Sequence, residues 1–190
     1  CLDENEFMVF GSGAAQEMHR RWFESHLDKF NLSYSNRSDE YHGLSIAGPN
    51  SRKVLEKIVR DDVSNEKFKF RDSRRMFVGG VPAIINRISF TGELGYEIYV
   101  APHYQLKLYE ELMEAGKEFN IKPFGGRALM SMRLEKNWGA WTLDYRPDFT
   151  AKETGLDAFI NWDKEFIGKE SAQKENSSNK LIPLIVETND

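Results

Sequence analysis

Apolar and polar positions alternate along this chain in short stretches that predict a mixture of strands and amphipathic helices. Apolar residues recur at helical spacing over 14–27, where Met18 and Trp22 mark the apolar side, and over 104–115. The predicted elements are, in chain order, a strand over 7–10, a helix over 14–27, a strand over 41–47, a helix that begins near Pro49, strands over 73–78 and 82–90, and helices over 104–115 and 127–135. Because the central strands are joined by hairpins, without a repeated strand–helix–strand rhythm, the sequence predicts an α+β fold with antiparallel sheets and packed helices.

A polar stretch near the end of the chain divides it unequally. Residues 174–180 are Lys, Glu, Asn and Ser only, which predicts a linker between a main domain over 1–173 and a new strand within 181–190. The chain opens at Cys1 in a polar turn, without an initiating methionine, and stops just after the new strand. We therefore interpret it as a fragment of a longer polypeptide, truncated at its N-terminal side.

Composition and charge exclude several classes of protein. The chain has 190 residues, of which 40% are hydrophobic and 29% charged, the usual balance of a globular protein. Its net charge of −4 does not favour a nucleic acid or an anionic membrane as partner, and no apolar run is long enough to span a bilayer. Cys1 is the single cysteine, so there is no internal disulfide or thiolate metal cluster, and the four histidines lack the spacing of a metal site. A reducing compartment fits: the cytoplasm, or the mitochondrial matrix in a eukaryote.

The most informative segment is 89–100, in which two glycines and two acids form a tight connection between strand-like runs. Gly92 and Gly95 can adopt positive φ or allow another group to approach the backbone closely. Glu93 and Glu97 lie four residues apart, so at least one carboxylate can be held at a pocket wall. A carboxylate fixed among aromatic residues suits a flat heterocycle with adjacent N–H donors, because it accepts two parallel hydrogen bonds. On the pattern alone, a hairpin with surface acids is the simpler interpretation.

Four blocks in a fixed order indicate a family. They are LSIAGPNS at 44–51, TGELGYEIYV at 91–100, GRALMSMRLEK at 126–136, and a fourth block in two pieces, ETGL at 153–156 and KEFIGKE at 164–170. In order and spacing these blocks resemble the aminomethyltransferase family, which contains the folate-binding T-protein of the glycine cleavage system. The third and fourth blocks most resemble the C-terminal folate-binding region of dimethylglycine and sarcosine dehydrogenases.

The resemblance implies a folate site and assigns residues to it. The family's acid that holds the pterin ring of tetrahydrofolate corresponds to Glu97, and the aromatic residue before the Thr-Gly pair, usually tyrosine, is Phe90 here. Arg127 is expected either to bind the glutamate tail of folate or to brace its own helix. Trp141 either belongs to the cofactor site or makes a core or domain contact. The family's catalytic aspartate corresponds to a position upstream of Cys1, so no catalytic residue is assigned in this chain.

The function implied by the resemblance is tetrahydrofolate-dependent one-carbon transfer. In the dehydrogenase relatives a flavin domain, with FAD outside these residues, oxidises an N-methyl amine, and the folate domain captures the carbon unit. The expected partners are therefore a folate and a flavin domain of the same polypeptide, and the apolar run within 181–190 would begin a C-terminal β-barrel. The alternatives are a stand-alone glycine-cleavage-type aminomethyltransferase and a folate-binding module without turnover.

Overall fold

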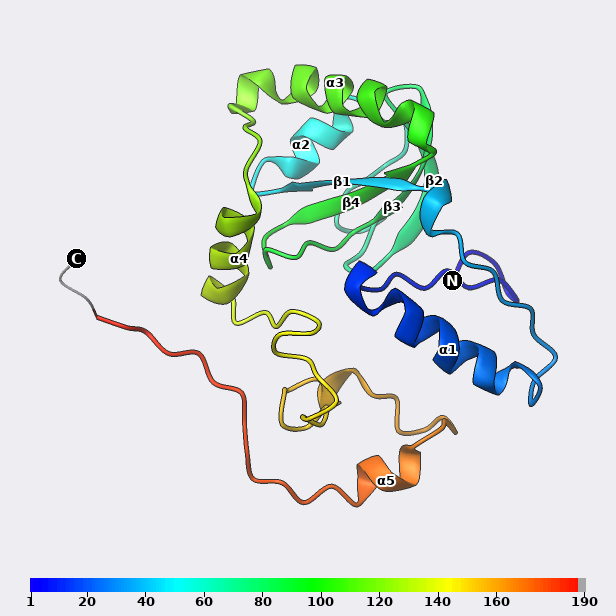
Figure 1. Ribbon diagram of the computed structural model, residues 1–190. Helices are drawn as coiled ribbons and strands as arrows, with labels where there is room; N and C mark the ends of the chain where they lie inside the picture. The colour runs from blue at the N-terminus through cyan, green and yellow to red at the C-terminus, as the bar shows by residue number, and fades with distance from the viewer. Residues whose placement is uncertain (188–190) are drawn as a thin grey trace. The chain divides into compact units, whose positions relative to one another are not determined.

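The computed structural model describes residues 1–187, which form two compact units (Figure 1). The first unit is Cys1–Met132 and the second is Arg133–Asp190, so the division falls within a helix, α4 (Gly126–Glu135). The predicted boundary at the polar stretch 174–180 stays a prediction.

The first unit is built on one four-stranded antiparallel sheet. Its strands lie in the order β1-β4-β3-β2, and β2 and β3 form a hairpin around Gly79 and Gly80, which both have positive φ, +57° and +79°. The strands are β1 (His42–Ala47), β2 (Ser73–Val78), β3 (Val81–Asn86) and β4 (Gly95–Val100). The antiparallel pairing confirms the predicted fold class and the predicted hairpin.

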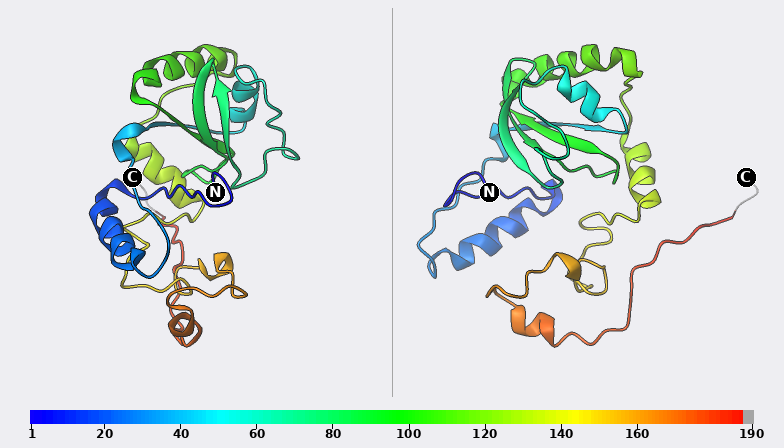
Figure 2. Two further views of the ribbon diagram at one scale, coloured as in Figure 1. Left: turned by 90° about the vertical axis from the view of Figure 1, so that its right-hand side faces the viewer. Right: turned by 180° about the vertical axis from the view of Figure 1, so that it is seen from behind.

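Two helices cover one face of this sheet and close the core (Figures 1 and 2). They are α2 (Ser51–Glu56) and α3 (Gln105–Gly116), and both contribute buried apolar side chains. Alternation along β4 sends Tyr96, Ile98 and Val100 to this face, where each is fully buried. Short 3-10 turns connect the elements: η2 (Ser38–Glu40), η3 (Pro102–Tyr104) and η4 (Lys117–Phe119).

The opposite face of the sheet carries both polar side chains, such as Glu97, and apolar ones, such as Ile84, and it meets the N-terminal segment. The ring of Phe10 lies 4.5 Å, between centroids, from the ring of Tyr99 on β4, and Glu6 pairs with Arg75 on β2 at 3.8 Å. The predicted strand over 7–10 is wrong, because these residues adopt no strand. Phe10 packs by its side chain against a sheet face, and in the described residues no strand edge pairs with the backbone of this segment.

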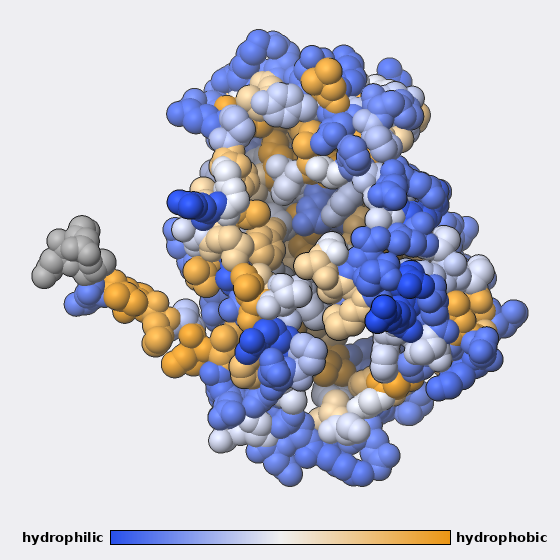
Figure 3. Space-filling model, viewed as in Figure 1, coloured by the Kyte–Doolittle hydropathy of each residue, from blue (hydrophilic) through white to orange (hydrophobic). Residues whose placement is uncertain are grey.

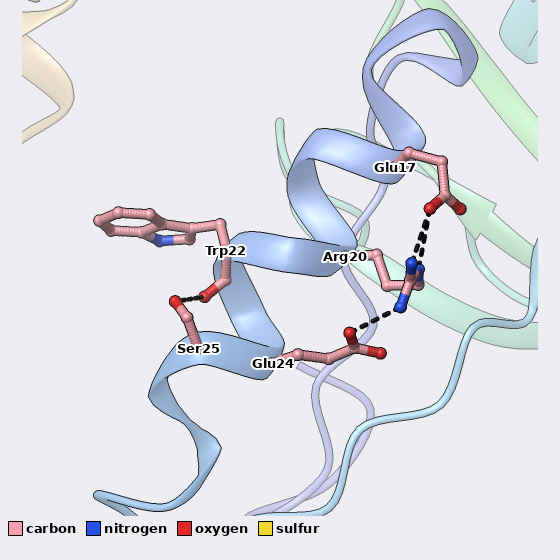
Figure 4. Close-up of polar contacts among 5 residues, drawn as sticks. All are labelled: Glu17, Arg20, Trp22, Glu24 and Ser25. Atoms are coloured by element: carbon pink, nitrogen blue, oxygen red, sulfur yellow. Dashed lines mark hydrogen bonds and ion pairs between the residues drawn. The ribbon is translucent and has the colours of Figure 1, made fainter.

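The predicted helix over 14–27 is confirmed as η1 (Gly13–Ala15) followed by α1 (Gln16–Leu27). Its charged residues pair along the helix, where Arg20 bridges Glu17 and Glu24 at 2.8 Å and 2.6 Å (Figure 4). Met18 and Trp22, which mark its apolar side, are 53% and 57% exposed. Amphipathic spacing shows that a helix has an apolar side but does not provide the surface that covers it.

The second unit has little regular structure and is organised around a buried ion pair. It contains η5 (Asp157–Phe159) and α5 (Lys169–Gln173). Arg133 is 5% exposed, and its Nη1 donates to Oδ2 of Asp144 at 2.5 Å and to the carbonyl of Trp138 at 3.0 Å. Asp144 also accepts the backbone N–H of Ala140 at 2.9 Å, so it caps a turn and balances the arginine. These contacts give Arg133 a structural role in the second unit.

The apolar run near the C-terminal end forms no strand over 181–187. Leu184 and Ile185 are 80% and 94% exposed, and Figure 3 shows the run as apolar surface leading to the chain's end. Residues 188–190 lie outside the described residues. The predicted start of a barrel is not confirmed by this arrangement.

Candidate functional site

The connection between β3 and β4 is a rigid, hydrogen-bonded loop. Ser89 and Thr91 are 6% and 2% exposed, and the Ser89 hydroxyl donates to the carbonyl of Glu93 at 2.5 Å. The Thr91 hydroxyl accepts the backbone N–H of Glu93 at 3.3 Å. Gly92 has φ of +72°, a conformation that favours glycine. These bonds hold both ends of the loop in place and make Glu93 a turn residue.

The loop is docked on the connection between β1 and α2 through Gly95 and Leu94. A Cβ atom on Gly95 would lie 2.7 Å from the carbonyl oxygen of Ile46 and 2.6 Å from Cβ of Ser89. The carbonyl of Leu94 accepts the backbone N–H of Gly48 at 2.8 Å and the hydroxyl of the buried Ser51 at 3.0 Å. Gly92 thus supplies the positive φ and Gly95 the close approach, so the two roles expected for glycine at this connection are divided between them.

Glu97 lies in the middle of β4, on the face away from α2 and α3. Its cross-strand neighbours are Ser45 on β1 and Asn86 on β3. The Tyr99 hydroxyl donates to Oε2 of Glu97 at 2.7 Å. Burial of Tyr99 raises the pKa of its phenol, and the hydrogen bond to the Glu97 carboxylate and its negative charge raise it further. At neutral pH Tyr99 is therefore a donor, and one oxygen of Glu97 is held by it.

A cavity of about 690 Å³ runs along β1, which is an edge strand of the sheet. Its walls come from residues 44–51, the side of α3 that faces them, the segment 119–124, and the side chains of Phe90 and Glu97. Consecutive residues of β1, Leu44 to Ala47, belong to this lining, together with Val54 of α2 and Leu129 of α4. Its size and mostly apolar lining are typical of a site for a small organic ligand.

The cavity has one charged residue of each sign among the described residues that line it. These are Glu97 and Lys122. Lys122 follows η4 in the segment that leads to α4, and the sequence analysis did not single it out. No recognisable motif surrounds Lys122 in the sequence. Only the folded arrangement therefore identifies it as a residue of the cavity.

The structure brings two of the four predicted cofactor residues together. Glu97 and Phe90 line the same cavity, whereas Arg127 is exposed in the first turn of α4 and is not part of the lining. Trp141 belongs to the second unit, where it is 59% exposed and meets Tyr145 edge-on with ring centroids 6.0 Å apart.

Residues 1–187 contain neither a metal-binding cluster of the usual side chains nor a helix able to span a membrane. No group of three or more His, Cys, Asp or Glu side chains in this range is placed to hold a metal ion. Within the same range, every helix is too short or too polar to cross a bilayer.

The sequence that forms this sheet and cavity matches a known family. Residues 1–164 match the family model described as the GCVT N-terminal domain, and the chain belongs to that family. The family resemblance expected from the four sequence blocks is thereby confirmed.

Relatives of known name fall in three groups. The chain is 36% identical over 193 residues to human mitochondrial dimethylglycine dehydrogenase, an alignment that covers 97% of this chain and 22% of that protein. It is 30% identical over 174 residues to an aminomethyltransferase of Thermoanaerobacter pseudethanolicus, with 90% and 47% covered. It is 30% identical over 182 residues to sarcosine oxidase subunit alpha of a Corynebacterium species, with 93% and 19% covered. The chain spans less than half the length of each of these relatives.

Proposed function

We propose that this chain is the part of a one-carbon-transfer enzyme that binds tetrahydrofolate, and that Glu97 holds the pterin ring. The observation that carries the proposal is the position of Glu97, which lines a cavity of about 690 Å³ together with Phe90. One of its oxygens accepts the Tyr99 hydroxyl at 2.7 Å, which supports a carboxylate kept in a fixed orientation.

The chemistry of the pterin edge matches a carboxylate. A pterin presents a ring N–H and an exocyclic amino group side by side, and a carboxylate accepts a hydrogen bond from each. Phe90 offers a flat apolar surface beside this acid, and the cavity's other walls are mostly apolar. Such walls favour a flat heterocycle and strengthen the hydrogen bonds by excluding water.

The acidic tail of folate requires a cation, and this part of the chain offers two. Lys122 lines the cavity, and Arg127 lies five residues further on, in the first turn of α4. An ammonium acts as a point charge for a carboxylate, whereas a guanidinium can bind it in a two-pronged manner. We assign the tail to this segment, with Lys122 as its contact within the cavity and Arg127 as the outer candidate. The expectation that Trp141 belongs to the cofactor site stays a prediction.

The reaction proposed is transfer of an aminomethyl or methylene carbon to or from the folate. The family match and the printed names of the relatives, dimethylglycine dehydrogenase and aminomethyltransferase, support it. The greater similarity to dimethylglycine dehydrogenase favours a polypeptide that also has an FAD-containing domain outside these residues. We propose a reducing compartment for it, the cytoplasm or the mitochondrial matrix. The protein's contribution would be to hold the reacting carbon next to its acceptor and to exclude water.

Calorimetric titration of this chain with tetrahydrofolate tests the proposal. The unmodified chain should bind with one site, and Glu97→Gln should weaken binding at least tenfold, since a charge-assisted pair of hydrogen bonds is lost. Glu93→Gln is the matched control, because Glu93 lies in the same loop region and has its role in the turn. Absence of binding by the unmodified chain, or equal loss in both variants, would contradict the proposed site.

A further inference from the structure

Tyr99 and Glu97 lie two residues apart on β4, so both side chains project from the same face of the sheet. The Tyr99 hydroxyl donates to Oε2 of Glu97 at 2.7 Å. In the described residues this is the hydrogen bond that the Glu97 carboxylate receives, which leaves Oε1 available to a ligand.

The ring of Tyr99 is itself held from two sides. Gly43 lies directly opposite Tyr99 on β1, and a Cβ atom there would come within 3.0 Å of Cε1 of the ring, so glycine allows the ring to lie against the strand. Phe10 packs on the same ring, with centroids 4.5 Å apart and planes inclined by 38°. The ring is thus contacted from two sides while its hydroxyl donates to Glu97.

We propose that Tyr99 is a positioning residue for the folate site, which holds the Glu97 carboxylate with Oε1 directed at the pterin, and that Phe10 and Gly43 hold Tyr99 in turn. This inference rests on the proposed function. A carboxylate on a flexible side chain must be ordered when ligand binds, and a residue that orders it beforehand removes that cost from binding. Burial raises the pKa of the Tyr99 phenol, so the group remains protonated and donates throughout the neutral range.

The arrangement also assigns a role to the N-terminal segment. Phe10 belongs to no helix or strand, yet it is the side chain of this segment that packs on Tyr99. Its contribution to folate binding would be indirect, through the ring that it packs against. Loss of Phe10 should therefore weaken folate binding in the unmodified chain. In a variant that already lacks the Tyr99 hydroxyl, loss of Phe10 should have no further effect.

The test compares the unmodified chain, Tyr99→Phe, Glu97→Gln and the double variant by equilibrium dialysis against tetrahydrofolate. Tyr99→Phe keeps the ring and its packing, so its melting temperature should stay near that of the unmodified chain while affinity falls roughly tenfold. In the Glu97→Gln background, loss of the hydroxyl should have little further effect, because the two residues act as a unit. Tyr41→Phe, a tyrosine outside the cavity lining, controls for general effects of removing a phenol.

Unchanged affinity in Tyr99→Phe would overturn the positioning role and leave the folate site intact. The same factor of loss in both backgrounds would also overturn it, since a packing effect does not depend on the carboxylate. If the unmodified chain fails to bind tetrahydrofolate, the proposed function fails and the inference fails with it.

Discussion

Glu97 and Lys122 contribute opposite charges to the lining of one cavity, although Glu97 lies on β4 and Lys122 in the segment between η4 and α4. The remaining lining is uncharged. A ligand that combines a hydrogen-bond-donating heterocycle with an anionic tail is complementary to both residues at once. Folate has this combination, whereas a pterin without the tail satisfies Glu97 alone.

The opposite charges of Glu97 and Lys122 predict that a change at Lys122 affects binding of tetrahydrofolate and of a tail-free pterin differently. Lys122→Gln should weaken tetrahydrofolate binding about tenfold and leave binding of tail-free tetrahydropterin unchanged, because only the tail is anionic. Arg127→Gln is the matched variant outside the lining. Calorimetry with both ligands measures each factor. A larger effect of Arg127→Gln would assign the tail to the helix, and equal losses for both ligands in Lys122→Gln would contradict a tail contact.

Gly95 should be intolerant of even a methyl group. Gly95→Ala places Cβ 2.7 Å from the carbonyl oxygen of Ile46, and backbone cannot yield as a flexible side chain does. We expect a loss of about 1–3 kcal/mol in the free energy of unfolding, measured by urea denaturation. Gly125→Ala is the control, since nothing lies within 4 Å of the added atom. Equal stabilities of the two variants would show that the loop is not docked as described.

The raised pKa of Tyr99 predicts an alkaline effect on stability. The folded chain keeps the phenol proton at pH values where the unfolded chain has lost it, so the unfolded state binds fewer protons and stability decreases with rising pH. The extra stability is fully present below about pH 10, the ordinary pKa of tyrosine, and is lost above it. Urea midpoints across this range should therefore fall more steeply in the unmodified chain than in Tyr99→Phe. Parallel profiles would mean that the phenol is not perturbed by folding.

The ion pair between Arg133 and Asp144 predicts that loss of its acid costs much more stability than loss of the acid of an exposed pair. Asp144→Ala leaves the Arg133 guanidinium, 6% exposed in its side chain, without its partner and should cost about 3–5 kcal/mol in the free energy of unfolding. Asp148→Ala removes an acid whose pair with Arg146 is exposed and should cost less than about 1 kcal/mol. Chemical denaturation followed by tryptophan fluorescence reports both. Similar small losses would show that the Arg133 pair does not organise this unit.

Local patterns were sufficient for features that depend on neighbouring residues. Alternation and the Gly79-Gly80 pair predicted the hairpin, and Gly92 and Gly95 predicted a tight, closely packed connection before Glu97. These features are encoded within a few residues, by backbone freedom and by the side-chain period of a strand.

Other features depend on distant contacts and were missed for that reason. Residues 7–10 have a strand-like composition, but a strand also needs an edge to pair with, and Phe10 packs instead on Tyr99. Lys122 has no motif around it, and its place in the cavity follows from how 119–124 folds beside β1. The sequence shows only that Tyr99 and Glu97 lie two positions apart in a strand, and so on the same face. Many unrelated pairs in strands share this spacing, so it does not predict their hydrogen bond.

Direct contact between Glu97 and the pterin is the central claim, and carboxyl ¹³C NMR of the glutamate-labelled chain tests it most directly. The signals of Glu97 and Glu93 can be assigned from Glu97→Gln and Glu93→Gln. On saturation with tetrahydrofolate, the Glu97 carboxyl signal should shift strongly while the Glu93 signal stays close to its original position. A bound folate that leaves the Glu97 signal unmoved would place the pterin elsewhere and contradict the account.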